Sequence, residues 1–227
     1  MEETKKSQLK EELLDVFNSK ALTQLLMVLS VDGYNYVKKV SDILGKSPSI
    51  VKEQLNTLKE FFIVSESGRA GIIQYYQVNE NFLKEVFSRY WVENFTNFWQ
   101  LLGWNPKEEL LRDIFQNISK APVSTYFVEY FKEISKRFVS ELEKLDIDER
   151  KKTLRKFNVT LFSLVTNFLI SFLLYYIKTG IETIINNVPE KMRPVLQDII
   201  NISEVLIPVF QDSVSVVGQI VSKHENQ

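Results

Sequence analysis

Residues 37–79 read VKKVSDILGKSPSIVKEQLNTLKEFFIVSESGRAGIIQYYQVN, and this stretch decides the fold. Its apolar residues first recur every three or four positions, which predicts a short helix over 37–44 and a second helix over 48–61. After Ile63 the period changes to two, which predicts a β-hairpin over 63–78 whose turn lies in 67–71.

The junction between the two predicted helices carries strong local signals. Gly45 suits a left-handed turn because it has no Cβ. Ser47 followed by Pro48 is typical of a helix start, since a hydroxyl cap precedes a residue whose missing N–H costs nothing at the first helical position. The residues that this helix is expected to bury are Val51, Leu55, Leu58 and Phe62.

Two helices joined by a tight turn and followed by a hairpin occur in this order in a winged helix-turn-helix, which docks its second helix into a DNA groove. Residues 19–80 resemble an ArsR-type winged helix-turn-helix domain. The likeness lies in SDILGKSPSIVKEQLNTLKEFFIVSESGRAGIIQYYQVN, with its leucine–glycine turn, its small hydroxyl residues and its tyrosine-rich last strand. It covers a little over a quarter of the chain. It implies a recognition helix over 48–61 and a wing over 63–78.

The resemblance also implies which side chains contact double-stranded DNA. By position these are Ser47, Ser49, Lys52, Glu53, Asn56, Lys59 and Arg69. Lys59 and Arg69 are expected on phosphates, with Arg69 at the wing tip. Asparagine can read adenine, and glutamate can accept a hydrogen bond from cytosine. The alternative for the same residues is a winged helix used for protein contacts, with an ordinary solvated face.

Composition excludes several classes of function. The 227 residues include no cysteine and a single histidine, His224, so thiolate chemistry, transition-metal sensing and a histidine-based active site are not expected. We therefore predict no enzyme, no catalytic residue, no metal site and no cofactor. The net charge of −1 is unusual for a DNA-binding protein, but residues 37–72 carry six basic against four acidic side chains.

Beyond residue 80 the pattern is helical throughout. An aromatic helix is expected over 82–104, where Tyr90, Trp91, Trp99 and Trp104 could wall a pocket for a small-molecule effector. Core or dimer-interface packing explains the same residues with fewer assumptions.

A long helix is expected over 147–188, opened by the capping pattern at Asp146. Within it, 157–177 is free of charge for 21 residues, which is long enough to span a bilayer. The flanking basic residues would keep the N-terminal domain cytoplasmic; they are Lys151, Lys152, Arg155, Lys156 and Lys178. A single polar stripe along the segment favours instead a buried helix in a soluble helical bundle.

The sequence thus predicts a mainly α protein. Residues 1–80 would form a winged helix-turn-helix with a small β-hairpin wing, and 81–227 an all-α dimerisation or effector domain. The expected function is a cytoplasmic transcriptional regulator that binds double-stranded DNA as a homodimer. The alternatives are a membrane-tethered regulator with a transmembrane helix at about 157–177, or a winged-helix protein-interaction module.

Overall fold

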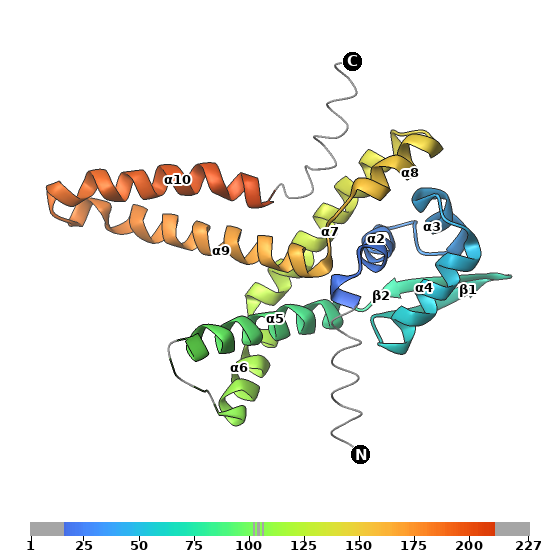
Figure 1. Ribbon diagram of the computed structural model, residues 1–227, viewed down its shortest axis with the longest axis horizontal. Helices are drawn as coiled ribbons and strands as arrows, with labels where there is room; N and C mark the ends of the chain where they lie inside the picture. The colour runs from blue at the N-terminus through green and yellow to red at the C-terminus, as the bar shows by residue number, and fades with distance from the viewer. Residues whose placement is uncertain (1–15, 102, 104, 106, 212–227) are drawn as a thin grey trace. The chain divides into compact units, whose positions relative to one another are not determined.

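The computed structural model describes residues 16–101, 103, 105 and 107–211 (Figure 1). The chain is mainly helical with one small antiparallel hairpin, which confirms this part of the prediction. It divides into two compact units, Met1–Phe162 and Ser163–Gln227. The boundary at residue 80 was predicted between a DNA-binding domain and a dimerisation or effector domain, and it stays a prediction.

The first unit holds the predicted helix pair and hairpin together with further helices (Figure 1). Its elements are α2 (Lys20–Leu29), α3 (Val37–Leu44), α4 (Pro48–Glu60), β1 (Val64–Ala70), β2 (Ile73–Val78), α5 (Glu80–Leu101), α6 (Glu108–Lys120), α7 (Pro122–Glu143) and α8 (Ile147–Lys156).

The core of the first unit combines aliphatic and aromatic side chains. α2 is largely buried, because it packs against α3, α4 and α7. Phe87 of α5 stacks on Phe127 of α7 with ring centroids 5.4 Å apart. Burial of one such ring stabilises the fold by about 1.5–3 kcal/mol.

The second unit is a helical hairpin in which α9 (Leu161–Ile184) and α10 (Arg193–Gln211) lie side by side (Figure 1). The short 3-10 helices η1 (Ile185–Asn187) and η2 (Glu190–Met192) connect them. The Lys178 Nζ atom lies 2.8 Å from Glu204 Oε1, which ties the two helices together. Both helices expose large apolar side chains, namely Leu173, Tyr175, Tyr176, Ile177, Val195, Ile199, Ile202 and Val205.

The predicted continuous helix over 147–188 is wrong, because the chain leaves the helical conformation after Lys156 and resumes it at Leu161. Phe157 is buried, with its ring centroid 4.9 Å from that of Phe138. The Leu161 N–H donates to Thr23 Oγ1 over 2.9 Å, so α2 supplies an acceptor at the new helix start. Contacts with α7 and α2 therefore place the break.

The uncharged segment 157–177 is accordingly not helical along its whole length. Among the described residues, one helical segment, Leu161–Asn187, is long and apolar enough to cross a bilayer.

Phe62 is also placed differently from the prediction, since its side chain is 80% exposed rather than buried. The Ile63 N–H donates to the Leu58 carbonyl and the Phe62 N–H to the Lys59 carbonyl, each over 3.0 Å, which ends α4 in a Schellman turn. Phe62 takes the left-handed position of this turn with φ 58°. The turn directs Phe62 outward, and Ile63 enters the core instead.

The hairpin spans nearly the predicted range, but its paired strands extend further toward a shorter turn than predicted. The register pairs Val64 with Val78 and Ala70 with Ile73, with a bulge between Glu66 and Gly68. The turn is therefore Gly71–Ile72 and not 67–71. Arg69 lies within β1 opposite Gln74, and so is not at the tip. The glycine that turns the chain is Gly71, at φ 62°.

Candidate nucleic-acid interface

The start of α4 is built by the local sequence as predicted. Gly45 ends α3 in the left-handed region at φ 59°. Ser47 caps α4, because its Oγ accepts a hydrogen bond from the Ile50 N–H over 3.4 Å, and Pro48 occupies the first turn. Such a cap stabilises a helix by about 1 kcal/mol. The Ser47 and Ser49 hydroxyls are also 2.9 Å apart, so the first two predicted site residues interact with each other.

The two faces of α4 differ sharply. Val51, Leu55 and Leu58 are at most 1% exposed and fix the helix to the core. The opposite face is exposed and polar, and it consists of Ser49, Lys52, Glu53 and Asn56. These positions follow one another at spacings of three, one and three, so they form a single stripe along the helix. The structure thus brings together, on one exposed face beginning at the Ser47 cap, five of the seven predicted residues.

Lys59 and Arg69 lie differently, since each is engaged within the protein. Lys59 forms an ion pair with Glu66 of β1, which joins the end of α4 to the hairpin. This hydrogen bond raises the pKa of Lys59 and lowers that of Glu66, so both stay charged near neutral pH. Arg69 Nε donates to Gln74 Oε1 over 2.6 Å, which leaves the rest of its guanidinium exposed. Arg69 can therefore still offer donors to a phosphate, whereas the charge of Lys59 is already compensated by Glu66.

An isolated β-bridge anchors the hairpin to the residue before α3, and the sequence pattern did not reveal it. Tyr36, the residue before α3, forms an isolated antiparallel bridge with Tyr75 of β2. The Tyr76 N–H donates to the Asn35 carbonyl over 2.7 Å, and the rings of Tyr36 and Tyr75 meet edge to face at 5.9 Å. α3, α4 and the hairpin therefore form one connected piece. The alternation of Tyr34, Asn35 and Tyr36 is the sequence signal that could have indicated this bridge.

Three apolar side chains near this face are exposed, and sequence reasoning did not single them out as surface features. Ile72 at the hairpin turn is fully exposed, Phe62 is 80% exposed, and Ile50 in the first turn of α4 is 45% exposed. They offer apolar contacts at the two ends of α4 and at the turn of the hairpin.

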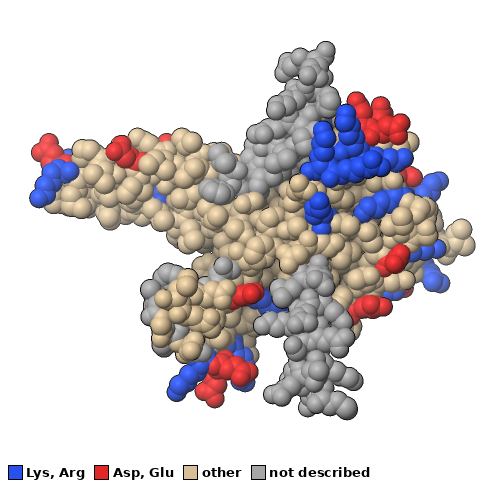
Figure 2. Space-filling model, viewed as in Figure 1, with Lys and Arg blue, Asp and Glu red and all other residues tan. Residues whose placement is uncertain are grey.

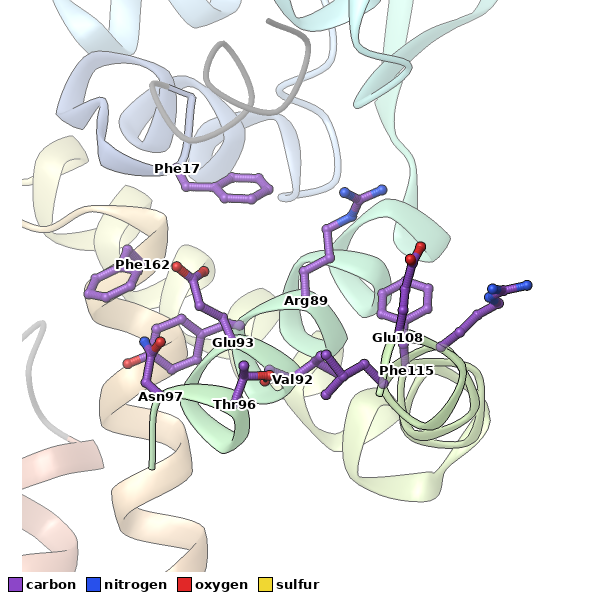
Figure 3. Close-up of a pocket in the computed structure, with 12 residues that line it drawn as sticks. Phe17, Arg89, Val92, Glu93, Thr96, Asn97, Glu108, Phe115 and Phe162 are labelled. Carbon is purple, nitrogen blue, oxygen red and sulfur yellow. The ribbon is translucent and has the colours of Figure 1, made fainter. Parts of the chain in front are cut away.

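A cavity of about 750 Å³ lies beside α5 in the first unit (Figure 3). Phe17 and Phe162 border one side of it in Figure 3, and Arg89, Glu93 and Glu108 bring charges to its wall. Arg89 Nε donates to Glu85 Oε1 over 2.9 Å, and its guanidinium lies 5.8 Å from the centroid of the Phe115 ring.

The predicted wall of aromatic residues is present only in part. Tyr90 lines the cavity, whereas Trp91 packs near Phe87 with ring centroids 6.5 Å apart. The side chains of Trp99 and Trp104 lie outside the described part of the chain, as does His224.

No family model, no curated protein and no solved structure matches this chain.

Proposed function

We propose that this protein is a transcriptional regulator that binds double-stranded DNA through a winged helix-turn-helix. In this proposal α3 and α4 form the helix-turn-helix and the β1–β2 hairpin is the wing. The single observation that carries the proposal is the outward polar stripe of α4, which is held in place by three buried residues and joined to the hairpin by the Lys59–Glu66 ion pair.

The dimensions and chemistry of α4 suit the major groove. Its 13 residues span about 20 Å, and a groove about 12 Å wide admits one helix. Asn56 carries the amide that pairs with the edge of adenine, and Glu53 can accept from a cytosine amino group. Lys52 and the serines at the helix start offer donors to phosphates or bases, and Arg69 offers donors from the wing.

The proposal includes a homodimer. Two copies would each present one α4, so that the pair reads half-sites about one helical turn apart. The exposed apolar side chains of α9 and α10 supply a surface that a second copy could cover.

We include in this proposal, as an optional part, a small-molecule effector that regulates the protein. The cavity beside α5 suits a ligand with an apolar or aromatic body, because Tyr90, Phe115 and Phe162 line it. Arg89 and Arg112 share this wall with Glu93 and Glu108, so a ligand could find both donors and acceptors there.

The test is a selection from a pool of random duplexes, followed by titration of the selected duplex. We expect Asn56→Ala to weaken binding about 10-fold or more and to relax discrimination at one base pair. Lys52→Ala should weaken binding to all sequences alike. The matched controls are Asn117→Ala and Lys120→Ala, which change the same residue types at exposed positions of α6. Selection of no duplex, or equal affinity of all five proteins, would contradict the proposal.

A membrane-tethered regulator is the second candidate, and the length and apolar composition of Leu161–Asn187 favour it. The DNA-binding face would be the same, and α9 would hold the protein at a bilayer. Fractionation distinguishes the two cases, because full recovery in the soluble fraction without detergent excludes the tether.

A protein-interaction module is the third candidate, favoured by the exposure of Phe62 at the end of α4 and of Ile72 at the hairpin turn. In that case Phe62→Ser and Ile72→Ser would abolish partner binding, while Lys52→Ala and Asn56→Ala would leave it intact.

A further inference from the structure

A second concentration of positive charge lies on α8, outside the predicted DNA-binding motif. Four of its side chains are basic and exposed, and we call them the α8 basic face: Lys151, Lys152, Arg155 and Lys156. Figure 2 shows them as a dense blue area over α8, with acidic side chains gathered at one end. The sequence had suggested only that these residues flank a membrane segment.

The α8 basic face is not neutralised within the protein. Within the described ranges none of its four side chains forms an ion pair, whereas Arg89, Lys132, Arg137 and Lys144 each pair with a glutamate. The nearest acids on α8 belong to its first turn, where Asp146 caps the helix by accepting from the Asp148 and Glu149 N–H groups at 2.9 Å.

A favourable interaction with the helix dipole explains only some of the four basic residues on α8. Basic residues are favourable in the last turn of a helix, which explains Arg155 and Lys156. Lys151 and Lys152 lie further from that end, so four unpaired cations on a ten-residue helix exceed what the dipole needs.

The packing of α8 shows where the α8 basic face lies relative to α4. Lys151 lies against the turn between α3 and α4, because a Cβ placed on Gly45 would be 3.0 Å from Lys151 Cγ. Arg150 fixes this docking: its Nη1 donates to the Asp42 carbonyl of α3 over 2.8 Å, and its Nε donates to the Leu142 carbonyl over 2.9 Å. The α8 basic face therefore begins beside the turn that leads into α4.

Two further hydrogen bonds hold α8 and the segment that follows it against α2. Gln24 Nε2 donates to the Leu154 carbonyl over 3.1 Å at a buried site, and Lys20 Nζ donates to Asn158 Oδ1 over 2.7 Å. Thr153 and Leu154 face the protein interior, which leaves the basic residues on the opposite, solvent side. α8 is thus part of the same compact unit as α4.

We propose that the α8 basic face binds the phosphate backbone of DNA next to the segment that α4 contacts. The inference rests on the proposed function and assigns to it a second contact region. A protein with a net charge of −1 needs a local surplus of cations to bind DNA, and the α8 basic face supplies four exposed cations. Each lysine or arginine that neutralises a phosphate steepens the salt dependence of binding by about 0.9 in the logarithmic slope.

The test compares the parent with a Lys152→Gln, Arg155→Gln double variant on one long selected duplex over a range of salt concentrations. These two positions are exposed and, unlike Lys151, do not pack on Gly45. We expect the slope of log affinity against log salt to fall by about two, with base discrimination unchanged. A Lys152→Arg, Arg155→Lys variant should keep the parental slope, and so should a Lys107→Gln, Lys120→Gln control at the two ends of α6.

The outcomes separate this inference from the function on which it rests. An unchanged slope in the double variant, while Asn56→Ala still weakens binding, refutes the role of the α8 basic face and leaves the proposed function standing. Absence of DNA binding by the parent refutes both. Binding of the parent to phosphatidylserine vesicles but not to DNA, lost in the double variant, would assign the face to a membrane surface and overturn the inference.

Discussion

Substitution of Gly45 by alanine tests how the turn between α3 and α4 is packed. Gly45 adopts φ 59°, where an alanine costs about 1–2 kcal/mol. The new Cβ would also meet Lys151 Cγ at 3.0 Å and Cε at 3.4 Å. Lys151 has a flexible side chain that can move aside, so we expect this second cost to be about 0.5–1 kcal/mol.

A double-mutant cycle separates the two costs. Gly45→Ala alone should lower the free energy of unfolding by about 1.5–3 kcal/mol, and Lys151→Ala alone by less than about 0.5 kcal/mol. In the double variant the Cβ meets no lysine, so the loss should be smaller than the sum by about 0.5–1 kcal/mol. Urea denaturation followed by tryptophan fluorescence measures this, because Trp91 of α5 belongs to the first unit.

The control cycle replaces Lys151→Ala with Lys152→Ala, and its two effects should be additive within about 0.3–0.5 kcal/mol. If the effects of the two substitutions are additive in both cycles, α8 does not pack against the turn. In that case the α8 basic face does not begin beside α4.

The remaining predictions concern the ends of α4 and the loop before α3. Ser47→Ala should lower the free energy of unfolding by about 1 kcal/mol in urea titrations, because the Ile50 N–H loses its acceptor; an unchanged midpoint would contradict the cap. Phe62→Asn should raise that free energy by about 0.5–1 kcal/mol, since asparagine tolerates the left-handed region and the lost ring is mostly exposed; a lower melting temperature would count against this. The hydrogen bond from Tyr34 to Glu143 raises the pKa of Tyr34 to about 12, so its stabilising contribution is complete below about pH 10 and is lost as the pH rises toward 12. Tyr34→Phe should lack this loss, and identical pH profiles for the two proteins would exclude it.

The parts of the fold that follow from local chemistry were predictable. Ser47, Pro48 and the spacing of Val51, Leu55 and Leu58 set both the start of α4 and its buried face. The same periodicity failed at Phe62, because it was extended past the point where the helix ends in a left-handed turn.

The parts that depend on distant contacts were not predictable. Hydropathy gives no sign of the break after Lys156, which follows from contacts with Phe138 and Thr23 far away in the chain. The docking of α8 on α3 joins Arg150 to Asp42 across 108 positions, and a single-residue bridge such as Tyr36–Tyr75 carries no periodic signal. The candidate site was therefore predictable along α4, and its extension onto α8 was not.

Site-directed cross-linking tests DNA binding by α4 most directly. The chain has no cysteine, so a single introduced cysteine can carry a photoactivatable cross-linker at one known position. We compare Ser49→Cys, on the exposed face of α4, with Asn117→Cys, exposed on α6. We expect cross-links from position 49 to defined bases of the selected duplex and none from position 117. If the bound DNA cross-links no better from position 49 than from position 117, this would contradict DNA binding by α4.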